Sequence, residues 1–144
     1  TLTDINIFNI ESIKQTLVNN NLKNEKIDVI LSDNLKSINE NNKFDIIVSN
    51  PPHIFSDSFF VDNTDIDSDK IGTYDVNWEF HEYFYQNCNK FLNTLGQVWF
   101  FENGTDANID DFLPIIKKNS NLKFKENFID FHDKNFFWMI SEKN

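Results

Sequence analysis

The chain has 144 residues and a formal net charge of −10 at pH 7, with 40% hydrophobic and 15% aromatic side chains. This length and apolar content predict one globular domain with a hydrophobic core. A single cysteine, Cys88, excludes an intrachain disulfide and a cysteine-based metal site. No apolar run approaches the roughly 18 residues of a membrane span, and the first residues lack the layout of a secretory signal. We therefore expect a cytoplasmic protein without a membrane partner.

The basic side chains are all lysines, and these 13 residues stand against 23 acidic ones. The planar fork of arginine, which reads phosphate groups and guanine, is thus absent from the sequence. This charge balance makes nucleic acid a less favoured partner than protein.

The first third of the chain alternates strands and helices. Residues 1–4 resemble the end of a strand, and the apolar residues of 6–20 recur at helical spacing. Residues 26–33 and 43–50 predict two strands separated by a brief helix or turn at 34–42. Near-continuous apolar runs of this kind are typical of parallel strands that are covered on both faces. The pattern therefore predicts an α/β fold.

An acidic loop of about twenty residues, 56–75, follows the strand at 43–50. Loops of this length are usually functional or disordered. Its apolar residues 59–61 suggest a segment that lies over a site, and its acidic part, 57–69, predicts a solvated flap. A second interpretation is that these acidic residues meet a positively charged partner protein.

The remaining residues predict two helices and three strands. An aromatic-rich helix over 76–96 is expected to place Phe80, Phe84 and Phe91 in the core and to end at Gly96. A strand at 97–104 and a helix at 108–120 follow. The chain ends in a predicted hairpin over 123–143, whose two strands flank the sequence HDKN.

The most specific motif is SNPPHIF at residues 49–55, directly after an apolar strand. The segment FDIIVSNPPHI resembles the class I S-adenosylmethionine-dependent methyltransferases that modify planar nitrogens, in which Asn/Asp-Pro-Pro-aromatic ends the fourth strand. The resemblance is strongest to the HemK-type protein-glutamine N-methyltransferases, which act on peptide release factors. Further matches lie in TDIN, LSDNL, GTYDVNWEFHEYF, GQVWFFENG and IDFHDKNFFWMI, so that the resemblance runs over essentially the whole chain.

This resemblance implies catalytic roles for Asn50 and Pro51 and substrate binding by Asn50, Pro51, Pro52 and His53. The Asn50 side-chain carbonyl and the Pro51 backbone carbonyl would accept both hydrogens of an NH₂ group and orient its nitrogen lone pair. The two prolines fix the backbone and remove two competing N–H donors. His53 stands where the family usually has Tyr or Phe to stack on a flat substrate group, and its ring is smaller and ionisable.

The resemblance also implies a Rossmann-like methyltransferase sheet, mostly parallel, with a C-terminal antiparallel hairpin and S-adenosyl-L-methionine as the cofactor. Asp4, at a strand end, would bind the ribose hydroxyls, Asp33 and Asn34 would lie beside the adenine, and Asn50 would also contact the cofactor. Because parallel sheets bind ligands at the carboxyl ends of their strands, these residues are expected to face one crevice. The alternative for Asp4 and Asp33 is a helix cap or a turn.

The family's glycine-rich loop, which follows its first strand, has no match. The three glycines, Gly72, Gly96 and Gly104, all lie downstream of Asp4. In the usual strand order 3-2-1-4-5-7-6, the missing first strand is central, and its loss would leave backbone groups unpaired. We therefore expect residues 1–144 to be the C-terminal portion of a single methyltransferase catalytic domain, or a chain whose partner supplies the missing strand.

Three functions follow from these observations. The first is methyl transfer to the side-chain amide of a glutamine in a protein. The second is methyl transfer to an exocyclic amine of a nucleic-acid base, and the third is a truncated, non-catalytic domain or partner subunit. No metal site is predicted, because the spacing of His81, Cys88 and His132 fits no known metal-ligand pattern. Glu102 is expected either to line the crevice or to cap its strand.

Overall fold

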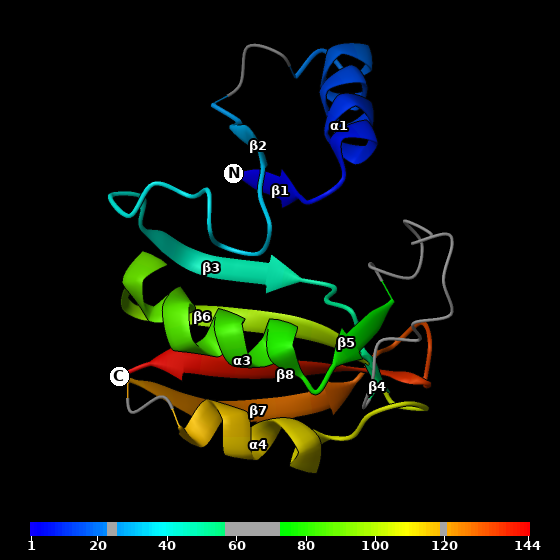
Figure 1. The fold of residues 1–144 in the computed structure, drawn as a ribbon, viewed down its shortest axis with the longest axis vertical. Helices are drawn as coiled ribbons and strands as arrows, with labels where there is room; N and C mark the ends of the chain where they lie inside the picture. Colours follow the sequence, from blue (N-terminus) through cyan, green and yellow to red (C-terminus); the bar gives the residue numbers. More distant parts are fainter. Residues whose placement is uncertain (23–25, 57–72, 119–120) are drawn as a thin grey trace. The chain divides into compact units, whose positions relative to one another are not determined.

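The computed structural model describes residues 1–22, 26–56, 73–118 and 121–144. These residues form two compact units, residues 1–39 and residues 40–144 (Figure 1). The sequence analysis expected one catalytic domain, and that assignment stays a prediction.

The first unit is a strand–helix–strand segment. It contains β1 (Leu2–Asp4), α1 (Ile7–Asn19) and β2 (Val29–Leu31), and the two strands pair in parallel. The helix begins where the Asn6 side chain accepts the backbone N–H of the second helical residue, which satisfies one of the unpaired donors of the first turn. Ile10 is the buried residue of α1. The strand, helix and strand predicted from the sequence are confirmed.

The second unit is built on a four-stranded mixed sheet. In spatial order its strands are β3 (Phe44–Ser49), β6 (Leu92–Asn103), β8 (Phe136–Lys143) and β7 (Leu122–Ile129). The β3–β6 pair is parallel, and β8 is antiparallel to both β6 and β7. This order reproduces the 4-5-7-6 part of the expected sheet and confirms the terminal hairpin.

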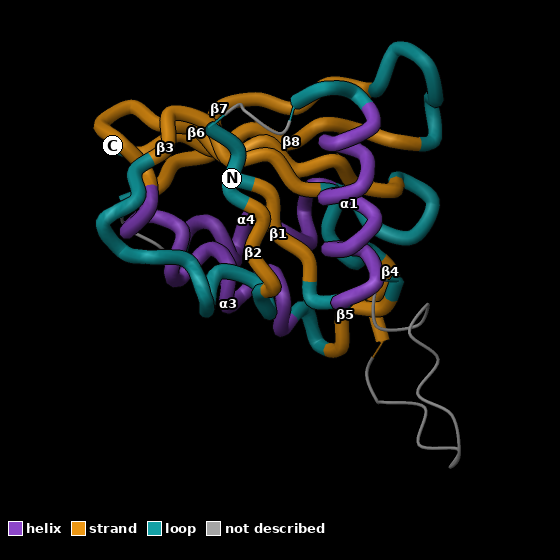
Figure 2. The backbone as a smooth tube through the Cα atoms, turned by 90° about the horizontal axis from the view of Figure 1, so that it is seen from above, coloured by secondary structure: helices purple, strands orange, loops and turns teal. Residues whose placement is uncertain are grey.

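Two helices cover one face of this sheet. They are α3 (Glu79–Asn87), which continues into the short 3₁₀ helix η1 (Cys88–Phe91), and α4 (Ile109–Lys117). Figure 2 shows α3 and α4 on the same side of the strands. Large buried side chains from both helices and from β6 and β8 form the core between them: Phe84, Tyr85, Phe100, Phe112, Ile116 and Met139. The helix α4 is a strongly amphipathic element with a capping box at Asn108.

Beside this sheet, β4 (Ile54–Ser56) and β5 (Tyr74–Val76) form a short parallel pair. The predicted acidic flap and its apolar residues 59–61 fall within 57–72, which lie outside the described residues. In this parallel pair, Ile54 lies opposite Tyr74 and Ser56 lies opposite Val76.

The prediction that a helix runs to Gly96 is wrong. The strand β6 begins at Leu92, and Gly96 lies inside it. A β-carbon on Gly96 would lie 2.9 Å from the backbone oxygen of Asn93 and 3.0 Å from that of Phe44. The glycine is thus required by close backbone approach where the β3–β6 register shifts, and it is Leu95 that takes a left-handed backbone, with φ 61°.

The strand β3 is also more exposed than the sequence predicted. The side chains of Ile46 and Val48 are 54% and 61% exposed, whereas burial on both faces was expected. Among the described strands only β6 pairs with β3, so β3 is an edge of its sheet. The prediction that β3 is covered on both faces is therefore wrong for Ile46 and Val48.

Candidate functional site

The segment Asn50–His53 leaves the carboxyl end of β3, as the sequence predicted. Asn50 is exposed, and Pro51 is buried directly behind it. Pro52 and His53 are half-buried, and β4 begins immediately afterwards. The polar side chain of Asn50 is thus accessible to a ligand, while the backbone that carries it is anchored on both sides.

The His53 ring lies against Phe136, with ring centroids 6.0 Å apart in an edge-to-face arrangement. Its Nδ1 atom is shielded from solvent and has no hydrogen-bond partner in the described structure. Burial lowers the pKa of His53, and the neighbouring Asp106 carboxylate and Pro51 carbonyl oppose this shift only in part. The Pro51 carbonyl therefore lies beside the imidazole ring.

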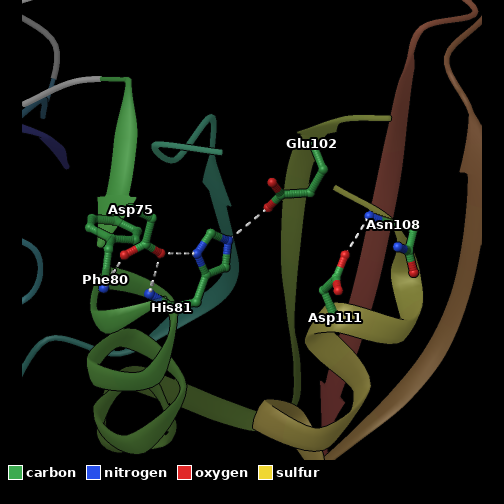
Figure 3. A network of polar contacts seen from close by, with 6 residues as sticks. All are labelled: Asp75, Phe80, His81, Glu102, Asn108 and Asp111. Carbon is green, nitrogen blue, oxygen red and sulfur yellow. Dashed lines mark hydrogen bonds and ion pairs between the residues drawn. The ribbon is translucent and has the colours of Figure 1, made fainter. Parts of the chain in front are cut away.

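A buried polar cluster of three residues connects β5, α3 and β6 (Figure 3). His81 Nδ1 lies 2.5 Å from an Asp75 carboxylate oxygen, and His81 Nε2 lies 3.0 Å from Glu102 Oε1. All three side chains are essentially inaccessible to solvent. Asp75 also accepts the backbone N–H groups of Phe80 and His81, so one carboxylate caps the start of α3 and holds the imidazole.

The surroundings of His81 favour the charged form of its imidazole ring. Burial alone would lower the pKa of His81, but its hydrogen bonds to Asp75 and Glu102 and the charges of these carboxylates raise that pKa overall. Burial raises the pKa of Glu102, and His81 offsets this rise only in part. The second carboxylate oxygen of Glu102 is buried and has no hydrogen-bond partner in the described structure. A proton placed on either residue is therefore retained better than in water.

Trp78 joins this cluster to the segment after the prolines. Its backbone is left-handed, with φ 57°, as is that of Asn77 before it, with φ 52°. The indole ring packs 5.4 Å from Phe55 of β4, 5.3 Å from His81 and 4.9 Å from Phe112 of α4 (centroid distances). An aromatic residue in this backbone region is strained, and three ring contacts hold it there.

In the first unit, Asp4 organises the turn between β1 and α1. Its carboxylate accepts the backbone N–H of Asn6 at 2.7 Å and the side-chain amide of Asn9 at 3.1 Å. Asp33 is exposed and pairs with Lys36 one turn later. Both acids thus have local structural contacts, and each carboxylate keeps acceptor capacity beyond these bonds, so their binding to a cofactor stays a prediction.

The predicted site residues fall in both units. Asp4, Asp33 and Asn34, the last with a left-handed φ of 53°, belong to residues 1–39, whereas Asn50 and the residues after it belong to residues 40–144. Their convergence on one crevice stays a prediction. Within the second unit, the Trp78 ring contacts both His81 and Phe55, so the buried cluster adjoins the segment after the prolines.

Sequence reasoning missed the buried cluster. It predicted no metal-binding role for His81, and it expected Glu102 at the crevice or at the end of its strand. The available signal was the acid and the histidine within GTYDVNWEFHEYF, together with an acid inside the apolar strand at 97–104. Within the described ranges, no group of His, Cys, Asp and Glu side chains is arranged so that it could hold a metal ion, and no described helix is long and apolar enough to cross a membrane.

Comparison with known proteins adds a family model and a set of solved structures. Residues 1–64, which include the Asn-Pro-Pro segment, match the model of the methyltransferase small domain. No curated protein sequence matches the chain.

Three similar structures are TrmN from Thermus thermophilus, a tRNA m1G37 methyltransferase from M. jannaschii, and the T. thermophilus 16S rRNA N2 G1207 methyltransferase RsmC in complex with AdoMet and guanosine. Their identities to this chain are 14%, 19% and 16%, and their TM-scores are 0.63, 0.61 and 0.59. Each match covers 99% of this chain but only 35%, 36% and 30% of the other. The chain therefore has a Rossmann-like methyltransferase fold and spans about a third of the length of these structures.

Proposed function

We propose that residues 1–144 form part of the catalytic domain of an S-adenosylmethionine-dependent N-methyltransferase. The observation that carries this proposal is the position of Asn50-Pro51-Pro52, directly after β3 in a methyltransferase fold. The ligand-binding end of such sheets is the carboxyl end of the strands, and Asn50 is exposed there.

The residues at this strand end suit a planar NH₂ group. Its nitrogen lone pair is delocalised into the adjacent carbonyl or ring, so the nitrogen must be held in a geometry that frees the pair. The Asn50 Oδ1 atom and the Pro51 carbonyl would accept the two hydrogens, and the neighbouring prolines offer no N–H group that competes for these acceptors. Positioning of this kind contributes a large part of the barrier reduction in transfer reactions.

The residues of the first unit fit the adenosine half of the cofactor. The Asp4 carboxylate, at the end of β1, retains acceptor sites for ribose hydroxyls, and Asp33 with Asn34 follows β2, where the adenine would bind. The methionine half has no matching glycine-rich loop within these 144 residues. When bound, the cofactor supplies an electrophilic methyl group.

For the methyl acceptor, we propose a glutamine amide in a protein partner. Support comes from the whole-chain resemblance to the protein-glutamine methyltransferases and from the net charge of −10, which repels nucleic acid. The second candidate is a base of RNA, because structures similar to this chain are named as tRNA and rRNA methyltransferases. A basic segment elsewhere in the complete natural protein would favour that candidate.

The test uses the complete natural protein, methyl-labelled S-adenosylmethionine and two acceptors, a peptide release factor and total cellular RNA. Label on a release-factor glutamine supports the proposal. Label on RNA alone would show that the methyl acceptor is a base of RNA and not a protein glutamine. Asn50→Ala is expected to abolish transfer while binding of S-adenosylhomocysteine, measured by calorimetry, is kept. Asp4→Ala is expected to weaken that binding.

The matched control is Asn127→Ala, because Asn127 is an exposed residue of β7. It should leave both transfer and binding unchanged. A folded protein that neither binds S-adenosylhomocysteine nor labels either acceptor would instead identify a non-catalytic member of this fold.

A further inference from the structure

The turn between β7 and β8, residues 130–135, lies at the same end of the sheet as Asn50. The strands β3 and β6 are parallel, so their carboxyl ends lie at one end of the sheet. The strand β8 runs antiparallel to β6 and begins with Phe136 opposite Asn103, so the turn that precedes β8 lies at this end as well. In Figure 1 the turn, in orange, lies at the end to which the β3 arrow points. It is therefore part of the rim around the proposed acceptor site.

Hydrogen bonds hold this turn in a fixed conformation. The Asp130 carboxylate accepts the backbone N–H of His132 at 2.9 Å and that of Asp133 at 3.0 Å. Its second oxygen accepts the indole N–H of Trp138, also at 3.0 Å. An aspartate side chain that bonds the backbone ahead of it is a common way to order a turn. These bonds therefore order the turn before any partner binds.

Two large apolar residues at this turn face solvent. Phe131 is 91% exposed, and Ile129, the last residue of β7, is 66% exposed. The Phe131 ring contacts the neighbouring His132 ring edge-on, with centroids 5.3 Å apart. Apolar surface in water is unfavourable, and a partner that covers it recovers this free energy. Because the backbone beneath is already ordered, such a partner would lose little conformational entropy on binding.

The charges near the turn indicate which kind of partner fits. The backbone N–H of Gly104 donates to the Asn135 carbonyl at 2.6 Å, so the loop that carries Asp106 lies beside the turn. The turn itself carries the exposed residues Asp133 and Lys134 together with the Asp130 carboxylate, so the acids outnumber the lysine. Acidic groups repel phosphate, and an aliphatic side chain offers no ring on which a base could stack. A protein surface with basic and apolar side chains complements both features.

We infer that Phe131 and Ile129 form a docking surface for the protein that carries the methylated glutamine. The partner covers them with an apolar side chain that has lysine or arginine beside it. This inference rests on the proposed function and deepens it, because it names a surface that selects the methyl acceptor.

The spacing of the strands predicts where the partner makes this contact. Three inter-strand spacings of about 4.8 Å separate β3 from β7, so the docking surface lies roughly 14 Å from Asn50. An extended chain spans this distance in about four residues. The apolar side chain of the acceptor is therefore expected about four positions from its glutamine.

The decisive experiment measures methylation by the complete natural protein of two acceptors, a peptide release factor and a five-residue peptide centred on its glutamine. Phe131→Ala should raise KM for the release factor about tenfold and leave kcat within about twofold, because the contact is the same in the ground state and the transition state. The short peptide does not reach the docking surface, so its kcat/KM should not change. Phe131→Leu keeps an apolar side chain and should restore most of the affinity.

A second readout does not depend on turnover. The release factor is titrated by calorimetry into protein saturated with S-adenosylhomocysteine, and Phe131→Ala should raise Kd about tenfold. Asp133→Asn should weaken this binding at low ionic strength and have little effect at high ionic strength. The matched control is Leu95→Ala, because Leu95 is 63% exposed near the opposite end of the same sheet. It should leave KM and Kd unchanged.

The outcomes separate the inference from the proposed function. A Phe131→Ala protein that methylates and binds the release factor like the unmodified protein overturns the docking surface and leaves the methyltransferase function intact. A lower kcat with an unchanged KM and Kd also overturns it. Label on RNA alone shows that the partner is not a protein, which overturns the inference while methyl transfer stands. An unmodified protein that labels neither acceptor overturns the proposed function, and the inference fails with it.

Discussion

Replacement of His81 by Phe is expected to destabilise the second unit strongly, although Phe is as apolar as the core around it. The imidazole bonds two carboxylates in a region without access to solvent, at 2.5 Å to Asp75 and 3.0 Å to Glu102. Asp75 would keep its two backbone donors, but Glu102 would lose its one described partner. Removing one member of a buried charged group costs about 3–5 kcal/mol.

The pH dependence of the free energy of unfolding provides a second test of the same cluster. Folding raises the pKa of His81 above its ordinary value of 6.5 and that of Glu102 above 4.5, so the native state binds more protons than the unfolded state above these values. Stability from such groups is fully present below the unfolded pKa and is lost as the pH rises through the folded one. The free energy of unfolding contributed by this cluster should therefore fall from about pH 5 towards pH 8.

The assay is urea unfolding followed by tryptophan fluorescence between pH 5 and pH 8. His81→Phe should lower the free energy of unfolding by about 3–5 kcal/mol, whereas the exposed control His132→Phe should change it by less than about 0.5 kcal/mol. The double variant His81→Phe, Glu102→Gln should recover part of the loss and remove the fall with pH. A loss below about 1 kcal/mol in the single variant, at every pH, would refute this account of the cluster.

Three further predictions concern local features of the second unit. Gly96→Ala should lower the melting temperature in a thermal scan, because its new methyl group would lie 2.9 Å from the backbone oxygen of Asn93 and 3.0 Å from that of Phe44; a stabilised variant would contradict that geometry. Burial raises the pKa of the Cys88 thiol to about 12, so a thiol reagent at pH 8 should react with the native protein far more slowly than with protein in urea. Asn108→Ala removes the acceptor of the α4 capping box and should cost about 1 kcal/mol in urea unfolding, whereas Asn108→Asp should cost little.

Periodicity and turn chemistry were sufficient for much of the fold. The alternation of strand and helix over residues 1–50 and the terminal hairpin were both predicted. In each of these elements, the spacing of the apolar residues reflects which face of that one helix or strand is buried. The boundary near Gly96 was not predictable in this way. Its backbone is shaped by contact with Phe44, some fifty positions earlier in the sequence, and no local pattern encodes such a contact.

Only the contiguous part of the candidate site was predictable from the sequence. Asn50-Pro51-Pro52 is a contiguous signal, and the strand end that it occupies follows from the apolar run before it. The Asp75–His81–Glu102 cluster joins three elements, and its members look like ordinary surface residues one by one. Charged residues are buried only where partners compensate them, so the tertiary structure was needed to find this cluster.

The edge position of β3 has a consequence for the behaviour of the chain in solution. A strand with exposed Ile46 and Val48 and one row of backbone groups that no described strand pairs with is a template for strand addition from a second molecule. Mutual repulsion between copies that each carry a charge of −10 opposes this contact, and its reach falls from about 30 Å at 0.01 M salt to about 8 Å at 0.15 M. Colloidal stability should therefore decline with ionic strength, and dilute, low-salt buffers are the conditions in which the chain stays monodisperse.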